Sequence, residues 1–137
     1  MANGNPENEY KIASENMRWY SNIRFAQLTL FFVLTAGLYN EVFSSKTAMP
    51  IFILVSLKIG GILSALAFAY LEKRADDYWF HYITRARNLE KKLGYKQYST
   101  RPDRSFSTST VILILYGAIV LFWLATLVFA QQFQIIP

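Results

Sequence analysis

The sequence predicts an all-α membrane protein with three transmembrane helices, the first two of which extend into the cytoplasm. Three apolar runs carry this prediction, at residues 25–43, 49–71 and 110–130. Each run is about as long as the roughly 20 residues that an α-helix needs to cross a bilayer. Charged residues make up only 17% of the 137 residues, against about 25% in soluble domains. So short a chain is too small to cover three such helices in a soluble fold.

The whole chain, residues 1–137, is expected to form a single membrane domain. The first run follows a polar segment and precedes no A-x-A site, so it is interpreted as an uncleaved anchor. Pro50 lies where a helix start tolerates proline, and Ser107 to Thr110 offer N-caps for the third helix. The short segment between the first two runs predicts an antiparallel hairpin.

The second helix is predicted to continue beyond the membrane to about Leu93. Apolar residues recur there at steps of three and four, the period of an amphipathic helix. Gly94 is a natural C-terminal residue for this helix, with basic side chains in its last turn. The first helix shows a similar stripe and is expected to begin near Pro6. Residues 94–108 then form the connection to the third span.

The distribution of lysine and arginine predicts the orientation in the membrane. Twelve of these residues lie before the first run or between the second and third, and one lies between the first and second. The positive-inside rule therefore predicts a cytoplasmic N-terminus and a C-terminus on the opposite side of the membrane. Five of the basic residues are expected to contact anionic lipid: Lys73, Arg74, Arg85, Arg101 and Arg104.

Lys58 is the most informative residue because it lies near the middle of the second span. An ionisable group at that depth is costly and is a functional hypothesis by default. Three interpretations are open: the side chain extends along its stem toward the interface, it pairs with Glu41, or it lines a pore. The same helix has a face of small residues, which predicts close helix packing within the chain or between subunits. That face comprises Gly60, Gly61, Ser64, Ala65 and Ala69.

Several classes of chemistry have no support in the sequence. The chain has no cysteine and one histidine, His81, and it lacks a phosphate-binding loop, a nucleophile elbow and a catalytic triad. Glu72 and Asp76 are expected to pair with neighbours such as Lys73 and Arg74 rather than to bind a metal. We therefore expect no catalytic residue, no metal and no cofactor. Membrane lipids are expected partners, and nucleic acid is not.

Three segments resemble an uncharacterised family of small multi-pass bacterial inner-membrane proteins. They are RFAQLT at 24–29, LEKRADDYW at 71–79 and RARNLEKKLGYKQYSTRP at 85–102. This resemblance implies a location and a topology, and it implies no activity. A looser likeness, of architecture alone, is to SLATT-type effectors, which have two membrane helices followed by a further helix. That likeness implies assembly into a pore, and the third span departs from it.

Two functional hypotheses follow from these features. The first is a non-catalytic accessory subunit of a larger membrane complex, such as a respiratory or photosynthetic assembly, with other subunits as partners. The second is a homo-oligomeric pore, motivated by Lys58 and the small-residue face. A membrane enzyme or transporter ranks last, because three helices with one charge near mid-membrane offer few polar groups.

Overall fold

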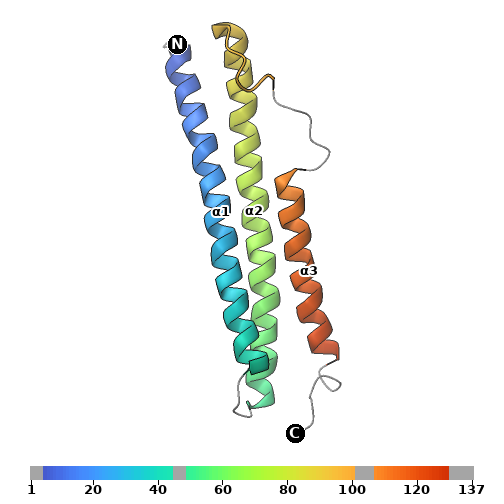
Figure 1. Ribbon diagram of the computed structural model, residues 1–137. Helices are drawn as coiled ribbons and strands as arrows, with labels where there is room; N and C mark the ends of the chain where they lie inside the picture. The colour runs from blue at the N-terminus through green and yellow to red at the C-terminus, as the bar shows by residue number, and fades with distance from the viewer. Residues whose placement is uncertain (1–4, 45–48, 101–106, 130–137) are drawn as a thin grey trace.

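The computed structural model describes residues 5–44, 49–100 and 107–129 and consists of three helices in these ranges. Helix α1 spans Pro6–Ser44, α2 spans Ile51–Leu93 and α3 spans Thr108–Val128. They run alternately down, up and down in Figure 1, so successive helices are antiparallel. The all-α prediction is confirmed, and all three helices are long and apolar enough to cross a membrane.

The lengths of the helices divide the molecule into two parts. With 21 residues, α3 is about 32 Å long at 1.5 Å per residue, close to the thickness of a bilayer core. The 39 residues of α1 and 43 of α2 make these helices roughly twice that long. Beyond the start of α3, only α1 and α2 run side by side among the described residues (Figure 1). We call this part, residues 5–24 and 72–93, the two-helix extension.

The helix ends have the local chemistry that the sequence predicts. Helix α1 begins at Pro6, and α2 ends at Leu93 before Gly94. Gly94 has a φ of 75°, in the left-handed region that favours glycine, and its N–H donates to the carbonyl of Glu90. Ser107 caps α3, because its side chain accepts a hydrogen bond from the N–H of Thr110.

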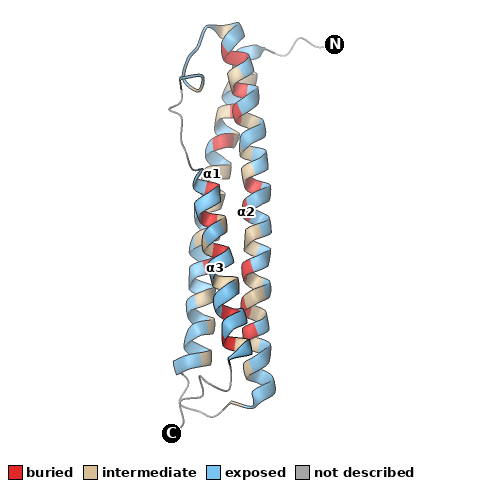
Figure 2. Cartoon of the chain, turned by 90° about the vertical axis from the view of Figure 1, so that its right-hand side faces the viewer, coloured by how far each residue is buried: buried red, intermediate tan, exposed pale blue. Residues whose placement is uncertain are grey.

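Apolar buried residues form two clusters, and Figure 2 shows buried positions in red along the length of the bundle. In the two-helix extension, Ala13 and Met17 of α1 pack against Ile83 and Ala86 of α2. The second cluster lies among the three spans and comprises Phe31, Ala65, Ile112 and Tyr116. Most other apolar side chains of the spans are exposed, as expected of helices that face lipid.

Helix α2 packs closely against both of the other helices, whereas α1 and α3 meet through aromatic side chains. The rings of Phe31 and Tyr116 have centroids 4.7 Å apart in a T-shaped arrangement. The ring of Phe43 stacks on Trp123 at 6.4 Å. Aromatic pairs of this kind each contribute about 0.5–1.5 kcal/mol beyond area burial. They hold α1 and α3 together where their backbones do not approach closely.

Candidate functional site

The ammonium group of Lys58 donates a hydrogen bond to the backbone carbonyl of Thr126 at 2.7 Å. Thr126 lies in the last turn of α3, where carbonyl groups have no partner within the helix. The C-terminus of a helix also carries partial negative charge, which favours a cation beside it. Lys58 is only 4% exposed and Thr126 only 5%. Lys58 of α2 therefore caps the C-terminal end of α3.

This contact differs from the ion pair with Glu41, one of the three interpretations of Lys58 that the sequence left open. Glu41 lies exposed on α1, and no ion pair joins it to Lys58 within the described ranges. The Lys58 side chain is buried against α3 and reaches a carbonyl in the last turn of that helix. The sequence did not identify a backbone carbonyl as the acceptor for Lys58, because the position of that carbonyl depends on how α3 packs.

The small-residue face of α2 packs largely within the chain. A Cβ atom added at Gly61 would lie 2.6 Å from ring atoms of Trp123, so the indole occupies the place of a side chain. Ala65 is fully buried in the cluster of the spans, and Ala69 packs against that cluster. Gly60 differs, because a Cβ atom there would meet no heavy atom within 4 Å. The hydroxyl of Ser64 donates to the carbonyl of Gly61 in its own helix.

A charged cluster joins α1 to α2 where the apolar part of each helix ends. Both Nε and an Nη atom of Arg24 donate to the same Glu72 carboxylate oxygen, with the Nε contact at 2.8 Å. A second contact joins Arg24 to Asp76 at 3.5 Å. The Glu72 side chain is 1% exposed, whereas that of Asp76 is 29% exposed. We call these three residues the Arg24 cluster.

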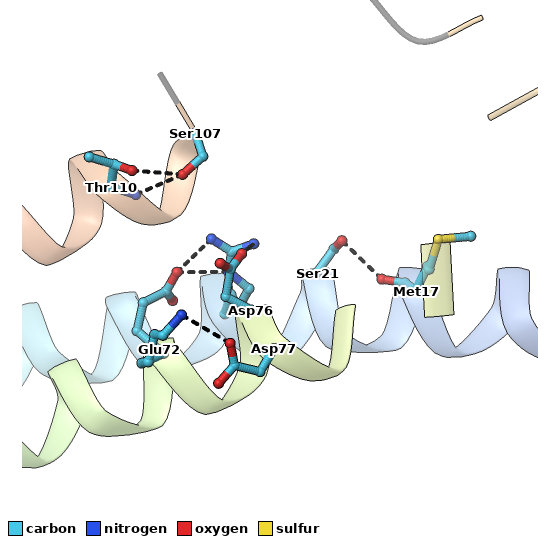
Figure 3. Close-up of polar contacts among 9 residues, drawn as sticks. Met17, Ser21, Glu72, Asp76, Asp77, Ser107 and Thr110 are labelled. Atoms are coloured by element: carbon cyan, nitrogen blue, oxygen red, sulfur yellow. Dashed lines mark hydrogen bonds and ion pairs between the residues drawn. The ribbon is translucent and has the colours of Figure 1, made fainter. Parts of the chain in front are cut away.

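The Arg24 cluster departs from the pairing that the sequence predicted for the acidic residues of α2. Glu72 and Asp76 contact Arg24 on the neighbouring helix instead of Lys73 and Arg74 on their own. Lys73 pairs with Asp77, and both of these side chains are more than half exposed. Figure 3 shows Glu72 and Asp76 on the side of the bundle that faces the Ser107–Thr110 turn, and Arg24 and Asp76 line a cavity together with Ser107. The cluster thus lies where all three helices come together.

A partly open cavity of about 220 Å³ lies beside the Arg24 cluster. It is lined by Ser21, Arg24, Phe25, Asp76, Trp79, Ser107, Thr108, Ser109 and Ile112. These residues come from all three helices and include the first turn of α3. The cavity is therefore the place where charged groups, helix-end amides and apolar side chains face a common space.

A second buried carboxylate, Glu90, organises the far end of the two-helix extension. It accepts hydrogen bonds from the Tyr10 hydroxyl at 3.0 Å and from the backbone N–H groups of Tyr98 at 2.8 Å and Ser99 at 3.0 Å. Burial acts to raise the pKa of Glu90, but these hydrogen bonds outweigh it and hold the pKa below its ordinary value. Burial and the contact with Glu90 raise the pKa of Tyr10 to about 12. Glu90 therefore ties the turn after α2 to α1.

The basic residues expected at lipid headgroups have varied surroundings. Arg74 lies over the ring of Tyr78 at 5.7 Å, and Arg85 pairs with Glu9 of α1 at 2.8 Å. Lys73 is engaged with Asp77. These three side chains are exposed on the surface of the two-helix extension, and their contact with lipid stays a prediction. Arg101 and Arg104 lie outside the described residues.

Possible metal ligands are scattered over the part of the chain that the structure describes. No three His, Asp or Glu side chains there lie close enough together to hold a metal ion. His81 is exposed and contacts the ring of Tyr82. The chemistry that the described residues offer is thus ion pairing, helix capping and polar recognition in the cavity. Comparison of the chain with protein-family models, with curated proteins and with solved structures gives no match.

Proposed function

We propose that this protein is a non-catalytic accessory subunit of a larger bacterial inner-membrane complex, which it stabilises by helix packing. The observation that supports this proposal best is the use of Lys58, the one charge within the second apolar run, as a cap for α3. A transporter or channel needs polar groups that face a path through the membrane. Here the charge is held inside the bundle by a contact that stabilises the fold.

Two surfaces suit contacts with neighbouring subunits. The spans expose many apolar side chains, against which other transmembrane helices pack as readily as lipid. The two-helix extension exposes aromatic side chains beside charged ones, including Trp19, Tyr78 and Phe80. Aromatic residues and arginine are enriched where protein partners bind. The lysine and arginine distribution supports a cytoplasmic location for this extension, with the N-terminus inside and the C-terminus outside.

The same contacts weaken the argument for the alternative function, a homo-oligomeric pore. Lys58 is buried at the α3 carbonyl, and Gly61 is covered by Trp123 of the same chain. A lumen formed by copies of the chain would therefore lack the charge that suggested it. A second copy of the chain could likewise not pack against the small-residue face at Gly61.

Native mass spectrometry of a tagged protein, extracted from its own membranes in mild detergent, tests the proposal. We expect a complex that contains this chain together with different polypeptides in fixed proportion. A mass equal to one copy or to a whole multiple of 15.8 kDa would contradict the accessory-subunit proposal.

Variants of the extension sharpen this test. Phe80 is 63% exposed, and Phe80→Ala should lower the recovery of the complex about tenfold if aromatic side chains of the extension bind the partner. Thr84→Ala is the control, since Thr84 lies exposed one turn further along α2. Equal losses in the two variants would argue against a specific contact at Phe80.

A further inference from the structure

The cavity at the junction of the three helices lies at the level where apolar spans give way to polar headgroups. Arg24 directly precedes the first apolar run, Asp76 follows the second by five residues, and Thr108 begins α3. Its volume of about 220 Å³ is below the roughly 300–1,000 Å³ of pockets that take drug-sized ligands. The cavity therefore has the position and size to receive a lipid headgroup.

One wall of the cavity offers hydrogen-bond donors and partial positive charge. The first turn of α3 directs its backbone amides toward the helix start, where a helix has donors without internal partners. The side chain of Ser107 accepts from the N–H of Thr110, and the carbonyl of Ser107 accepts from Val111. Thr108 and Ser109 line the cavity, and the hydroxyl of Ser109, which is 3% exposed, has no hydrogen-bond partner among the described residues. This wall is suited to a phosphate.

The opposite wall carries a carboxylate that can accept a further hydrogen bond. Two nitrogens of Arg24 are engaged by Glu72, and the contact of Arg24 with Asp76 is long, at 3.5 Å. The Arg24 cluster contains two carboxylates and one guanidinium, so it holds one surplus negative charge. Asp76 is the more exposed of the two acids and lines the cavity. This wall is suited to an ammonium group.

We propose that this cavity binds the zwitterionic headgroup of a phospholipid with a primary amine, phosphatidylethanolamine in chemical class. The phosphate lies at the Thr108 and Ser109 amides, and the ammonium donates to Asp76. The surplus carboxylate disfavours a purely anionic headgroup, and a choline headgroup has no N–H to donate. Phe25 and Ile112, which also line the cavity, give the acyl chains an apolar exit. This inference rests on the cavity alone and is independent of the proposed function.

Native mass spectrometry of the purified protein with equal amounts of three lipids tests the inference. The lipids are phosphatidylethanolamine, phosphatidylcholine and phosphatidylglycerol with the same acyl chains. We expect one retained phosphatidylethanolamine, preferred about tenfold over the other two, as loss of one hydrogen bond to a charged group implies. Equal retention of the three lipids, or a preference for phosphatidylglycerol, would overturn the proposal.

Matched variants test which group of the lipid headgroup binds at each wall. Asp76→Asn should reduce the preference for ethanolamine over choline to about twofold or less, because the ammonium loses its charged acceptor. Asp77→Asn should leave that preference unchanged, since Asp77 is 64% exposed and engages Lys73. Equal effects of the two substitutions would contradict the role of Asp76.

The phosphate wall is tested by replacing one backbone amide. Thr108→Pro removes an N–H at the first helical position, where proline is tolerated, and Ser107 already has the extended backbone that a following proline requires. Thr108→Ala is the control that removes the side chain and keeps the N–H. We expect Thr108→Pro to weaken retention of ethanolamine lipid several-fold relative to Thr108→Ala. Equal retention by this pair, with both variants folded by circular dichroism, would overturn the phosphate assignment.

Discussion

Gly61 of α2 lies so close to Trp123 of α3 that a Cβ atom on the glycine would be 2.6 Å from the ring atoms Cε2 and Nε1. Trp123 has no exposed surface, so an added methyl group would have to displace a buried indole. We therefore expect Gly61→Ala to lower the free energy of unfolding by about 1–3 kcal/mol, the usual cost of overpacking. Unfolding in detergent, followed by circular dichroism, measures this change.

The neighbouring Gly60 supplies the control for this prediction. It lies in the same helix, and a Cβ atom there would meet open space. Gly60→Ala should leave stability unchanged or raise it by up to about 1 kcal/mol, since alanine favours helix more than glycine does. If the two substitutions had the same effect, the close packing of Gly61 on Trp123 would be refuted.

Removal of Arg24 should be among the most damaging single changes. Arg24→Gln leaves the Glu72 carboxylate, which is 1% exposed, without its cation, and we expect a loss of about 3–5 kcal/mol. The double variant Arg24→Gln with Glu72→Gln should recover a large part of that loss, because it removes both charges. The same unfolding measurement made on the single and double variants checks this recovery.

Lys73→Gln is the matched control for Arg24→Gln. Lys73 also pairs with an acid on α2, but both side chains of this pair are exposed, at 60% for Lys73 and 64% for Asp77. Exposed pairs contribute little to stability, so Lys73→Gln should change it hardly at all. A double variant no more stable than Arg24→Gln alone would show that the buried charge is not the source of the loss.

Stability should depend on pH through Glu90. Hydrogen bonds hold its pKa in the folded protein below the ordinary value of 4.5. The stabilisation is therefore present above pH 4.5 and is lost as the pH falls through the lowered pKa. The pKa of Tyr10 is raised from 10.0 to about 12, so its contribution is complete below pH 10.0 and is lost as the pH rises through about 12. Between these limits the Tyr10–Glu90 contact should persist.

Unfolding of Glu90→Gln beside wild type, as a function of pH, measures this dependence. The variant should be about 1–3 kcal/mol less stable at pH 7, since it loses charge-assisted hydrogen bonds. The difference should narrow as the medium is acidified below pH 4.5. Glu15→Gln, an exposed change on α1, is the control. A constant difference at all pH values would contradict the role of the ionised Glu90.

The helices were predictable from the sequence because their signals are local. Apolar run length gave the three spans, the amphipathic repeat extended α2 to Leu93, and Gly94 marked its end. Proline at the start of α1 and the serine cap of α3 depend only on the chemistry of the first turn. Each of these features is determined by a few consecutive residues.

The contacts of the candidate site were less predictable because they depend on how the helices align. Arg24 and Glu72 are 48 residues apart, although both border apolar runs at the same end of an antiparallel hairpin. From that shared position, the ion pair between Arg24 and Glu72 could have been predicted. Nothing local identifies the carbonyl of Thr126 as the partner of Lys58, since every helix end has such carbonyls.

The central claim, that the charge of Lys58 stabilises the bundle and lines no pore, is tested most directly by conductance in planar bilayers. The purified protein should not conduct ions, because Lys58 is 4% exposed and bonded to α3. Lys58→Glu should not create a selective current either. An anion-selective current in wild type that Lys58→Glu converts to cation selectivity would place Lys58 in a lumen and contradict the account.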